Sequence, residues 1–271
     1  MVRFGQFLFL GTGSSAGVPV IGCHCAVCAS SHVKNKRLRS SGILSIGHKK
    51  LLVDAGPDFR QQAIQNDISS LDALFLTHTH YDHVGGLEEL RAFTLKNDIS
   101  LPCFLSEESY ESVRKLFYYH FQEKNPLNNR TAEFDYRLLK GSSGQFSCLD
   151  ETFEYIHYRQ GSMPVIGFRV GSFAYLTDLK EYSQELVEKV RGVDVLVTST
   201  LRFGHSKVQM DVDEAVDFIK VIGAKKAYLM HMSHEIDYDY LASLLPQSIE
   251  PAYDGLKISF SWELKNERCC Y

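Results

Sequence analysis

Short runs of apolar residues dominate the first third of the chain, and this pattern is typical of β-strands. These runs are residues 6–10, 42–46, 50–53 and 73–77. Between the second and third runs, Ile46-Gly47-His48-Lys49 predicts a hairpin turn. Apolar positions then recur at the spacing of a helix. The helices predicted in this way are residues 59–65, 87–95 and 107–121.

The second part of the chain repeats this order. Residues 122–150 are rich in Asn, Ser and Gly and fit neither pattern, so we expect an irregular insertion there over one face of the protein. Strand patterns then resume, and strands alternate with helices. The expected elements are residues 153–158, 166–170, 173–177, 183–190, 193–199, 212–222, 226–230 and 238–245. Within 212–222, an apolar stripe at helical spacing predicts a face that packs on the core: Val212, Ala215, Val216 and Ile219.

Both halves of the chain therefore place hairpins before βα units. Mixed sheets with helices outside them bury both kinds of element, and a sandwich of two such layers does so most economically. The sequence predicts an α/β protein, and we expect one domain over residues 1–271.

Composition excludes several functional classes. Of the 271 residues, 44% are hydrophobic and 23% are charged, which excludes a disordered or fibrous protein. The net charge of −4 gives no basic surface for nucleic acid or membrane lipid. The apolar residues 7–10 are too short for a signal sequence, so we expect a cytoplasmic protein. The seven cysteines then favour metal binding over disulfides.

The strongest chemical signal is Thr77-His78-Thr79-His80-Tyr81-Asp82-His83, which follows the apolar strand sequence DALFLT. Side chains two residues apart on an extended strand point to the same side, so His78 and His80 should converge. Asp82 and His83 follow where the chain turns toward a helix. Imidazole and carboxylate groups suit zinc, manganese or iron, so this turn predicts a hydrolytic metal site.

This His-x-His-x-Asp-His motif resembles the hallmark of the metallo-β-lactamase-fold hydrolases, and the resemblance extends over essentially the whole chain. It implies a four-layer αββα sandwich with two divalent ions, zinc or manganese, at the edges of the sheets. Asp54 in LLVDAG resembles the aspartate that orients a ligand histidine, and Asp178 in AYLTD resembles the carboxylate that bridges the ions. The resemblance implies the following ligands: His78 and His80 for the first ion, and Asp82, His83 and the late His231 for the second.

A second motif narrows the resemblance. The N-terminal Cys23-His24-Cys25-Ala26-Val27-Cys28 offers three thiolates, one ligand short of a tetrahedral zinc shell. It resembles the motif of the PhnP-type phosphodiesterases and of their PQQ-biosynthesis relative. By this resemblance the fourth ligand is His234, three residues after His231, and the site is a structural zinc. His24 is a weaker candidate.

The chain departs from this family at two positions. The histidine expected four residues before Pro164-Val165 is Gln160, so the first ion is either weakly bound or held by His78, His80 and Asp178 alone. A longer loop would instead bring His157 to that place. The second departure concerns the position from which the family protonates the leaving group. Either His205 or Gln209 occupies that position in this chain. The other histidines, His32, His48 and His120, are expected to be solvated or locally hydrogen-bonded.

These features predict a phosphodiesterase for small cyclic or linear nucleotide-like substrates. The resemblance implies a water near Asp82 that attacks phosphorus, while His205 assists the leaving oxygen. A tRNA 3′-processing nuclease is disfavoured because residues 122–150 carry few basic side chains, and a β-lactamase because no export signal is seen. A non-hydrolytic, PQQ-biosynthesis-like binding protein stays open because of Gln160 and Gln209. The sequence does not decide whether the protein is a homodimer, and we expect it not to bind a membrane.

Overall fold

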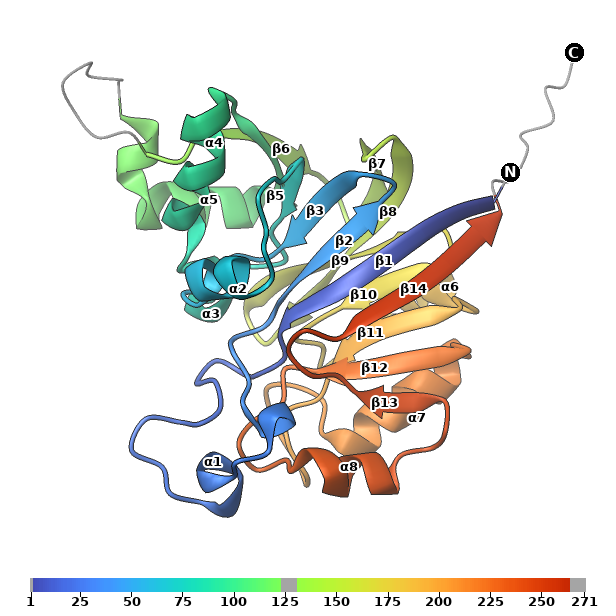
Figure 1. Ribbon diagram of the computed structural model, residues 1–271. Helices are drawn as coiled ribbons and strands as arrows, with labels where there is room; N and C mark the ends of the chain where they lie inside the picture. Colours follow the sequence, from blue (N-terminus) through green and yellow to red (C-terminus); the bar gives the residue numbers. More distant parts are fainter. Residues whose placement is uncertain (1, 123–130, 264–271) are drawn as a thin grey trace, which may run out of the picture.

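A computed structural model describes residues 2–122 and 131–263, and two seven-stranded sheets form its centre (Figure 1). In spatial order, the first sheet contains β14 (Lys257–Glu263), β1 (Val2–Gly11), β2 (Ser41–Ile46), β3 (Lys49–Val53), β4 (Ala73–Phe75), β5 (Leu101–Ser106) and β6 (Phe134–Leu139). The second contains β13 (Ile249–Pro251), β12 (Lys226–Met230), β11 (Val195–Ser199), β10 (Phe173–Leu176), β9 (Met163–Val170), β8 (Glu151–Gln160) and β7 (Ser143–Cys148).

The two sheets share one pattern of strand direction. In the first sheet, β14, β1, β2 and β3 pair antiparallel, and β3 to β6 pair parallel. In the second, β7 to β10 pair antiparallel and β10 to β13 pair parallel. This confirms the prediction that hairpins precede βα units in both halves, because hairpins make antiparallel pairs and crossovers make parallel ones.

Helices cover the outer faces of the two sheets, except the short α1, which lies apart from them on an N-terminal loop (Figure 1). The helices are α1 (Ala26–Ala29), α2 (Phe59–Gln65), α3 (Tyr81–Val84), α4 (Arg91–Asn97), α5 (Glu107–Leu116), α6 (Gln184–Val190), α7 (Val212–Ile222) and α8 (Tyr238–Leu244). Three short 3₁₀ helices are η1 (Val33–Asn35), η2 (Leu87–Leu90) and η3 (Tyr118–Phe121). None of the helices in the described ranges is long and apolar enough to cross a lipid bilayer.

Three large apolar clusters hold these layers together. The first lies between the sheets, where Phe7 of β1 packs on Tyr175 of β10 with ring centroids 5.5 Å apart. The second packs the other sheet under α6, α7 and α8, and the third packs the first sheet under α2, α4 and α5. The order helix, sheet, sheet, helix confirms the expected αββα sandwich.

Helix α7 shows how local sequence sets one of these layers. Asp211 accepts the N–H of Glu214, whose side chain accepts the N–H of Asp211, so the helix begins with a capping box. It ends at Gly223, which has a φ of 71° that suits glycine. The predicted stripe faces the core through Val212, Ala215 and Ile219.

Two sequence predictions need correction. The expected helix over 107–121 ends at Leu116 and is followed by η3. The expected irregular insertion at about 122–150 contains two regular edge strands, β6 and β7, in its described part; residues 123–130 lie outside the described residues. Edge strands have one solvated face and half of their hydrogen bonds, so their polar sequences resemble those of loops.

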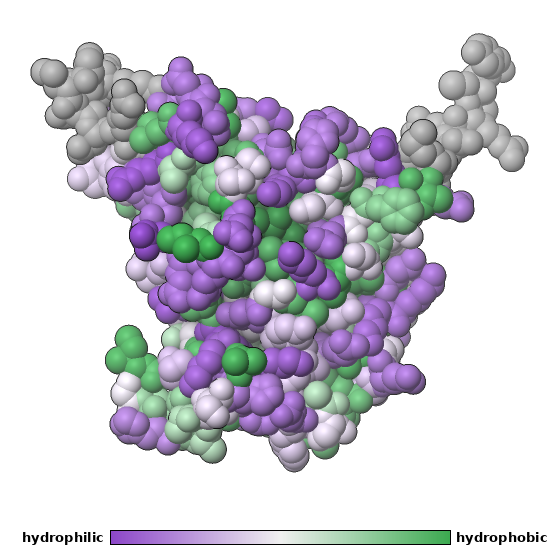
Figure 2. Space-filling view, in the orientation of Figure 1, coloured by the Kyte–Doolittle hydropathy of each residue, from purple (hydrophilic) through white to green (hydrophobic). Residues whose placement is uncertain are grey.

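The face seen in Figure 2 is mainly hydrophilic, and its apolar residues occur in scattered groups. One group lies where β1 begins and β14 ends, where Phe4 of β1 is 70% exposed. Small separate apolar groups of this kind are ordinary on the surfaces of folded proteins.

Candidate functional site

The histidine-rich segment after β4 brings its side chains together as the sequence predicted. His78 and His80 converge, with Nε2 of the first 3.0 Å from Nδ1 of the second. His80 is also the N-cap of α3, the short helix that carries Asp82 and His83. A strand end and one helical turn therefore place all four side chains at the same edge of the first sheet.

Residues from the second sheet complete two groups of ligand atoms that each lie within 4.8 Å of one another. The first group is His78, His80 and Asp178, and the second is Asp82, His83 and His231. Asp178 follows β10 and His231 follows β12, so the groups form where the parallel strands of both sheets end. These are the six side chains that the family resemblance assigned to the active-site ions.

Backbone strain marks the same places. Asp54 after β3, Asp178 after β10 and His231 after β12 have φ values of 60°, 55° and 62°. A non-glycine residue in this left-handed region costs about 1–3 kcal/mol, and such strain concentrates at functional sites. The repeated turn aims each side chain out of its strand end toward the site.

Asp54 orients His83 and is itself fixed on three sides. It accepts the Nδ1–H of His83 at 2.7 Å, and the N–H and hydroxyl of Thr77, each at 2.8 Å. This leaves Nε2 of His83 buried without a hydrogen-bond partner, 3.3 Å from Oδ2 of Asp178 and 3.4 Å from Oδ2 of Asp82. A buried imidazole nitrogen facing two carboxylates fits a divalent cation between them.

The electrostatics of the site also fit a cation. Burial by itself would raise the pKa of Asp82 and of Asp178, but hydrogen bonds and positive charge from His231 and His83 hold both values well below the ordinary range. Burial lowers the pKa of His83, and the carboxylates of Asp178 and Asp54 outweigh it and raise the pKa well above normal. Two ionised carboxylates among buried imidazoles make an N/O donor set that suits zinc or manganese.

Both glutamines singled out by the sequence contact Asp178. Nε2 of Gln160 donates to Oδ1 of Asp178 at 3.2 Å, and Nε2 of Gln209 donates to the same oxygen. His157 lies three residues earlier in β8, and neither metal-ligand group of the described residues includes it. His205 lies exposed beside Asp211 and Glu214, outside the cluster that contains Asp178.

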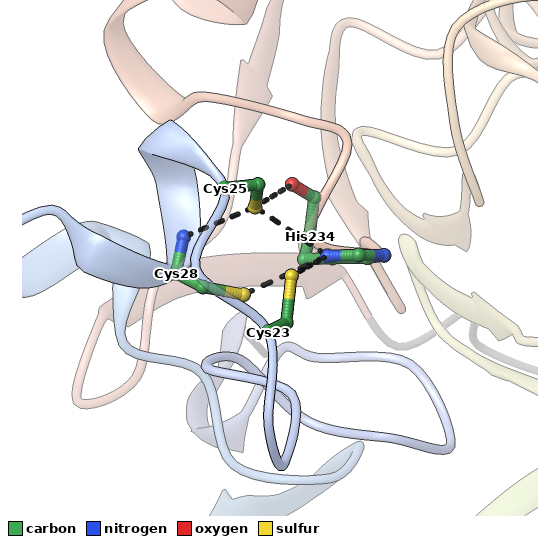
Figure 3. Close-up of side chains that lie close together, drawn as sticks. All are labelled: Cys23, Cys25, Cys28 and His234. Atoms are coloured by element: carbon green, nitrogen blue, oxygen red, sulfur yellow. Dashed lines mark hydrogen bonds between the residues drawn. The ribbon is translucent and has the colours of Figure 1, made fainter.

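The N-terminal cysteines meet the late histidine in a separate cluster (Figure 3). Nδ1 of His234 lies 3.3, 3.5 and 3.6 Å from Sγ of Cys23, Cys25 and Cys28. The backbone N–H of Cys28 lowers the pKa of Cys25 to about 6, with His234 contributing and burial opposing. Three sulfurs and one imidazole nitrogen are a donor set for tetrahedral zinc. His24 is outside this group among the described residues.

Sequence reasoning did not identify Arg37, which connects the cysteine-bearing loop to the segment after His231. Its guanidinium is buried and donates to the carbonyls of Ser233 and Ile236 at 3.1 and 2.8 Å, and to Oδ1 of Asn35 at 2.9 Å. No signal in a single sequence distinguishes this arginine from solvated ones. The remaining histidines have local roles where partners are seen: His32 accepts the N–H of Lys34, and His120 pairs with Glu88 at 2.5 Å.

Comparison with known proteins places these groups in a family context. Residues 49–232 match the model of the beta-lactamase superfamily domain. An octanoyltransferase of Porphyromonas gingivalis is 36% identical over 259 residues, which are 92% of this chain and 50% of that protein. The chain thus spans half the length of this relative.

Solved structures resemble the chain over nearly its whole length. A diphosphatase from the PhnP family has a TM-score of 0.88 and 31% identity, with 97% of this chain and 100% of that chain covered. Zinc-bound PqqB from Methylobacterium extorquens has a TM-score of 0.72 and 19% identity over 93% of this chain and 99% of that chain, and shares the fold.

Proposed function

The chain belongs to the β-lactamase superfamily as a metallo-β-lactamase-fold hydrolase of the PhnP type, and from that premise we propose that it is a metal-dependent phosphodiesterase. The proposed substrates are small cyclic or linear nucleotide-like phosphodiesters. The proposed active site holds two divalent ions, zinc or manganese, on the side chains His78, His80, Asp82, His83, Asp178 and His231.

The position of Asp178 between the two ligand groups is the observation that carries this proposal. Its carboxylate belongs to the group with His78 and His80, and its oxygens also lie 3.3 Å from Nε2 of His83 and 3.4 Å from Nε2 of His231. A carboxylate that reaches both groups is suited to two ions held close together. Paired ions of this kind are typical of sites that hydrolyse phosphate esters.

The side chains around the ions have distinct roles in this proposal. Bound divalent ions acidify water and neutralise charge on phosphate oxygens. The low pKa of Asp82 keeps its carboxylate ionised, so it would accept a hydrogen bond from a water molecule beside His83 and His231. His205, exposed on the loop before α7 and within 4.8 Å of carboxylate oxygens of Asp211 and Glu214, would donate a proton to the leaving oxygen.

We further propose that Cys23, Cys25, Cys28 and His234 hold a structural zinc. This cluster joins the loop that carries α1 to the segment after His231, although the two are more than 200 residues apart in sequence. A closed four-ligand site of this kind contributes to folding and leaves no position for substrate. It would stabilise one wall beside the active site.

Hydrolysis of model esters by manganese-reconstituted protein tests the function. We expect cleavage of bis(p-nitrophenyl) phosphate that is lost on chelation and in Asp82→Ala. A phosphomonoester, p-nitrophenyl phosphate, serves as the comparison substrate and should react more slowly. Cleavage of a nucleoside diphosphate but not of the diester would instead indicate a diphosphatase, the activity named for the similar PhnP-family structure.

A second candidate is a non-hydrolytic binding protein, which the contacts of Gln160 and Gln209 with Asp178 favour. Amide N–H groups on this carboxylate compete with metal ions for its lone pairs. Protein that binds metal yet cleaves none of the three substrates would support this candidate. The octanoyl transfer named for the longer relative is not proposed, since this chain spans half of that protein.

A further inference from the structure

The two glutamines leave Asp178 with too few lone pairs for two ions. Oδ1 of Asp178 accepts N–H groups from both Gln160 and Gln209, and a carboxylate oxygen has two lone pairs. Oδ2 accepts the hydroxyl of Thr177 at 2.8 Å, which leaves one lone pair there. Oδ2 can therefore serve one ion, and a second ion needs Oδ1. One of the two glutamines must release Oδ1 before that ion binds.

The structure indicates which glutamine moves. Gln209 is 4% exposed, and its backbone N–H donates to the hydroxyl oxygen of Ser206. Gln160 is only half-buried at the end of β8, and it donates to Asp178 at 3.2 Å, at the long end of the range for such a hydrogen bond. In both side chains Oε1 is buried without a hydrogen-bond partner. Gln160 is thus the glutamine with a weaker hold on Asp178 and an unused oxygen beside the site.

A half-turn of the Gln160 amide would place its carbonyl oxygen where Nε2 now lies, 3.2 Å from Oδ1 of Asp178. Two oxygens this close repel unless a cation lies between them. Neighbouring oxygen ligands around one octahedral ion are roughly 3 Å apart, so the separation matches shared coordination. We propose that Gln160 exchanges its hydrogen bond to Asp178 for carbonyl coordination of the ion at His78 and His80, while Gln209 keeps Asp178 in place.

This inference rests on the proposed metal site. It gives the ion at His78 and His80 more oxygen ligands than a site with three histidines would. Amide and carboxylate oxygens favour manganese, whereas imidazole favours zinc. The ion at His78 and His80 should therefore show a greater relative preference for manganese than it would with an imidazole at residue 160.

The test measures metal binding directly. Manganese bound per chain is counted by electron paramagnetic resonance, while zinc retained by the cysteine cluster is counted separately by elemental analysis. We expect two manganese ions in the wild type, one of them bound at least roughly tenfold more weakly in Gln160→Leu and restored in Gln160→Glu. Gln160→His should shift the manganese-to-zinc affinity ratio of that ion toward zinc by about tenfold or more.

Gln209→Leu is the matched control, because it removes an identical side chain from the same carboxylate oxygen. It should leave the manganese-to-zinc ratio unchanged, since Gln209 is not a ligand. The wild-type protein can also be labelled with ¹³C at the side-chain carbonyl of its glutamines. Manganese should then shift the infrared band of one labelled carbonyl, and Gln160→Leu should lack this band. The manganese-dependent shift is measured on the wild type, and Gln160→Leu serves only to assign the band.

Two results would overturn the inference. One is Gln160→Leu with unchanged stoichiometry and affinities, and the other is wild type that binds one manganese ion while Gln160→Leu binds two. The second result would mean that Gln160 blocks the site. Failure of the proposed function looks different: the metal results hold as expected, but the protein hydrolyses no phosphate ester.

Discussion

Replacement of Arg37 by Met tests the connection between the cysteine-bearing loop and the segment that carries His234. Arg37 is 1% exposed. Its guanidinium donates hydrogen bonds to the carbonyls of Ser233 and Ile236, which are distant in sequence, and to Oδ1 of Asn35 on its own loop. Burial lowers its pKa to about 10, while the charges of Asp254 and Asp237 oppose this shift. The arginine is therefore charged at neutral pH and is stabilised by these contacts.

The magnitude follows from the acceptors that Met would leave. The carbonyl of Ser233 still accepts the N–H of Ile236, and Oδ1 of Asn35 still accepts the N–H of Tyr238. The carbonyl of Ile236 loses the guanidinium hydrogen bond and has no other donor among the described residues, so one buried acceptor is left unpaired and two lose one of their hydrogen bonds. A stranded acceptor costs about 1–3 kcal/mol, and removal of a buried charge returns part of its desolvation cost. We expect a loss of about 2–3 kcal/mol in the free energy of unfolding.

Equilibrium unfolding in urea measures this loss, with zinc content measured on the same samples. The control is Arg114→Met, because Arg114 pairs with Glu111 at 3.4 Å and both side chains are more than half exposed. An exposed pair of this kind should change stability by less than about 1 kcal/mol. If Arg37→Met loses no more stability than Arg114→Met and keeps its zinc, then Arg37 does not hold the two segments together.

Further predictions concern the two metal sites and the pH dependence of stability. Asp82→Ala should reduce diester hydrolysis by roughly 10²-fold or more without unfolding the protein, and parental rates in that variant would refute the assigned site. Cys25→Ser should release the tightly held zinc and lower the melting temperature; parent protein without such zinc by elemental analysis would contradict the cluster's role. His157→Ala should leave manganese affinity unchanged in calorimetry, because Gln160 and not His157 contacts Asp178, and a large loss of affinity would favour His157 as a ligand. Burial raises the pKa of Asp254 to about 7, so the folded state binds more protons than the unfolded chain between about pH 4 and 7, and stability should fall as pH rises through this range, by at most roughly 1.4 kcal/mol per pH unit. Urea unfolding at several pH values checks this, and an Asp254→Asn variant with the parental slope would exclude Asp254 as its source.

The sequence by itself determined the features that depend on neighbouring residues. Convergence of His78 and His80 follows from the two-residue repeat of an extended segment, and Asp82 and His83 lie in the next helical turn. The order of hairpins and βα units likewise follows from local hydrophobic patterns, which set strand direction within each sheet. A resemblance to a family, rather than any local rule, pointed to Asp178, since an aspartate after a strand is common.

Only the tertiary structure decided which distant side chains meet. It showed that Gln160 and Gln209 share one oxygen of Asp178, and that Arg37 is buried against the segment carrying His234. It also showed that residues 134–139 and 143–148 are edge strands, whose polar sequences a pattern search reads as loop. One physical reason applies to all of these contacts. They depend on how the two sheets pack, and local propensity carries no record of a partner 18, 31 or 196 residues away.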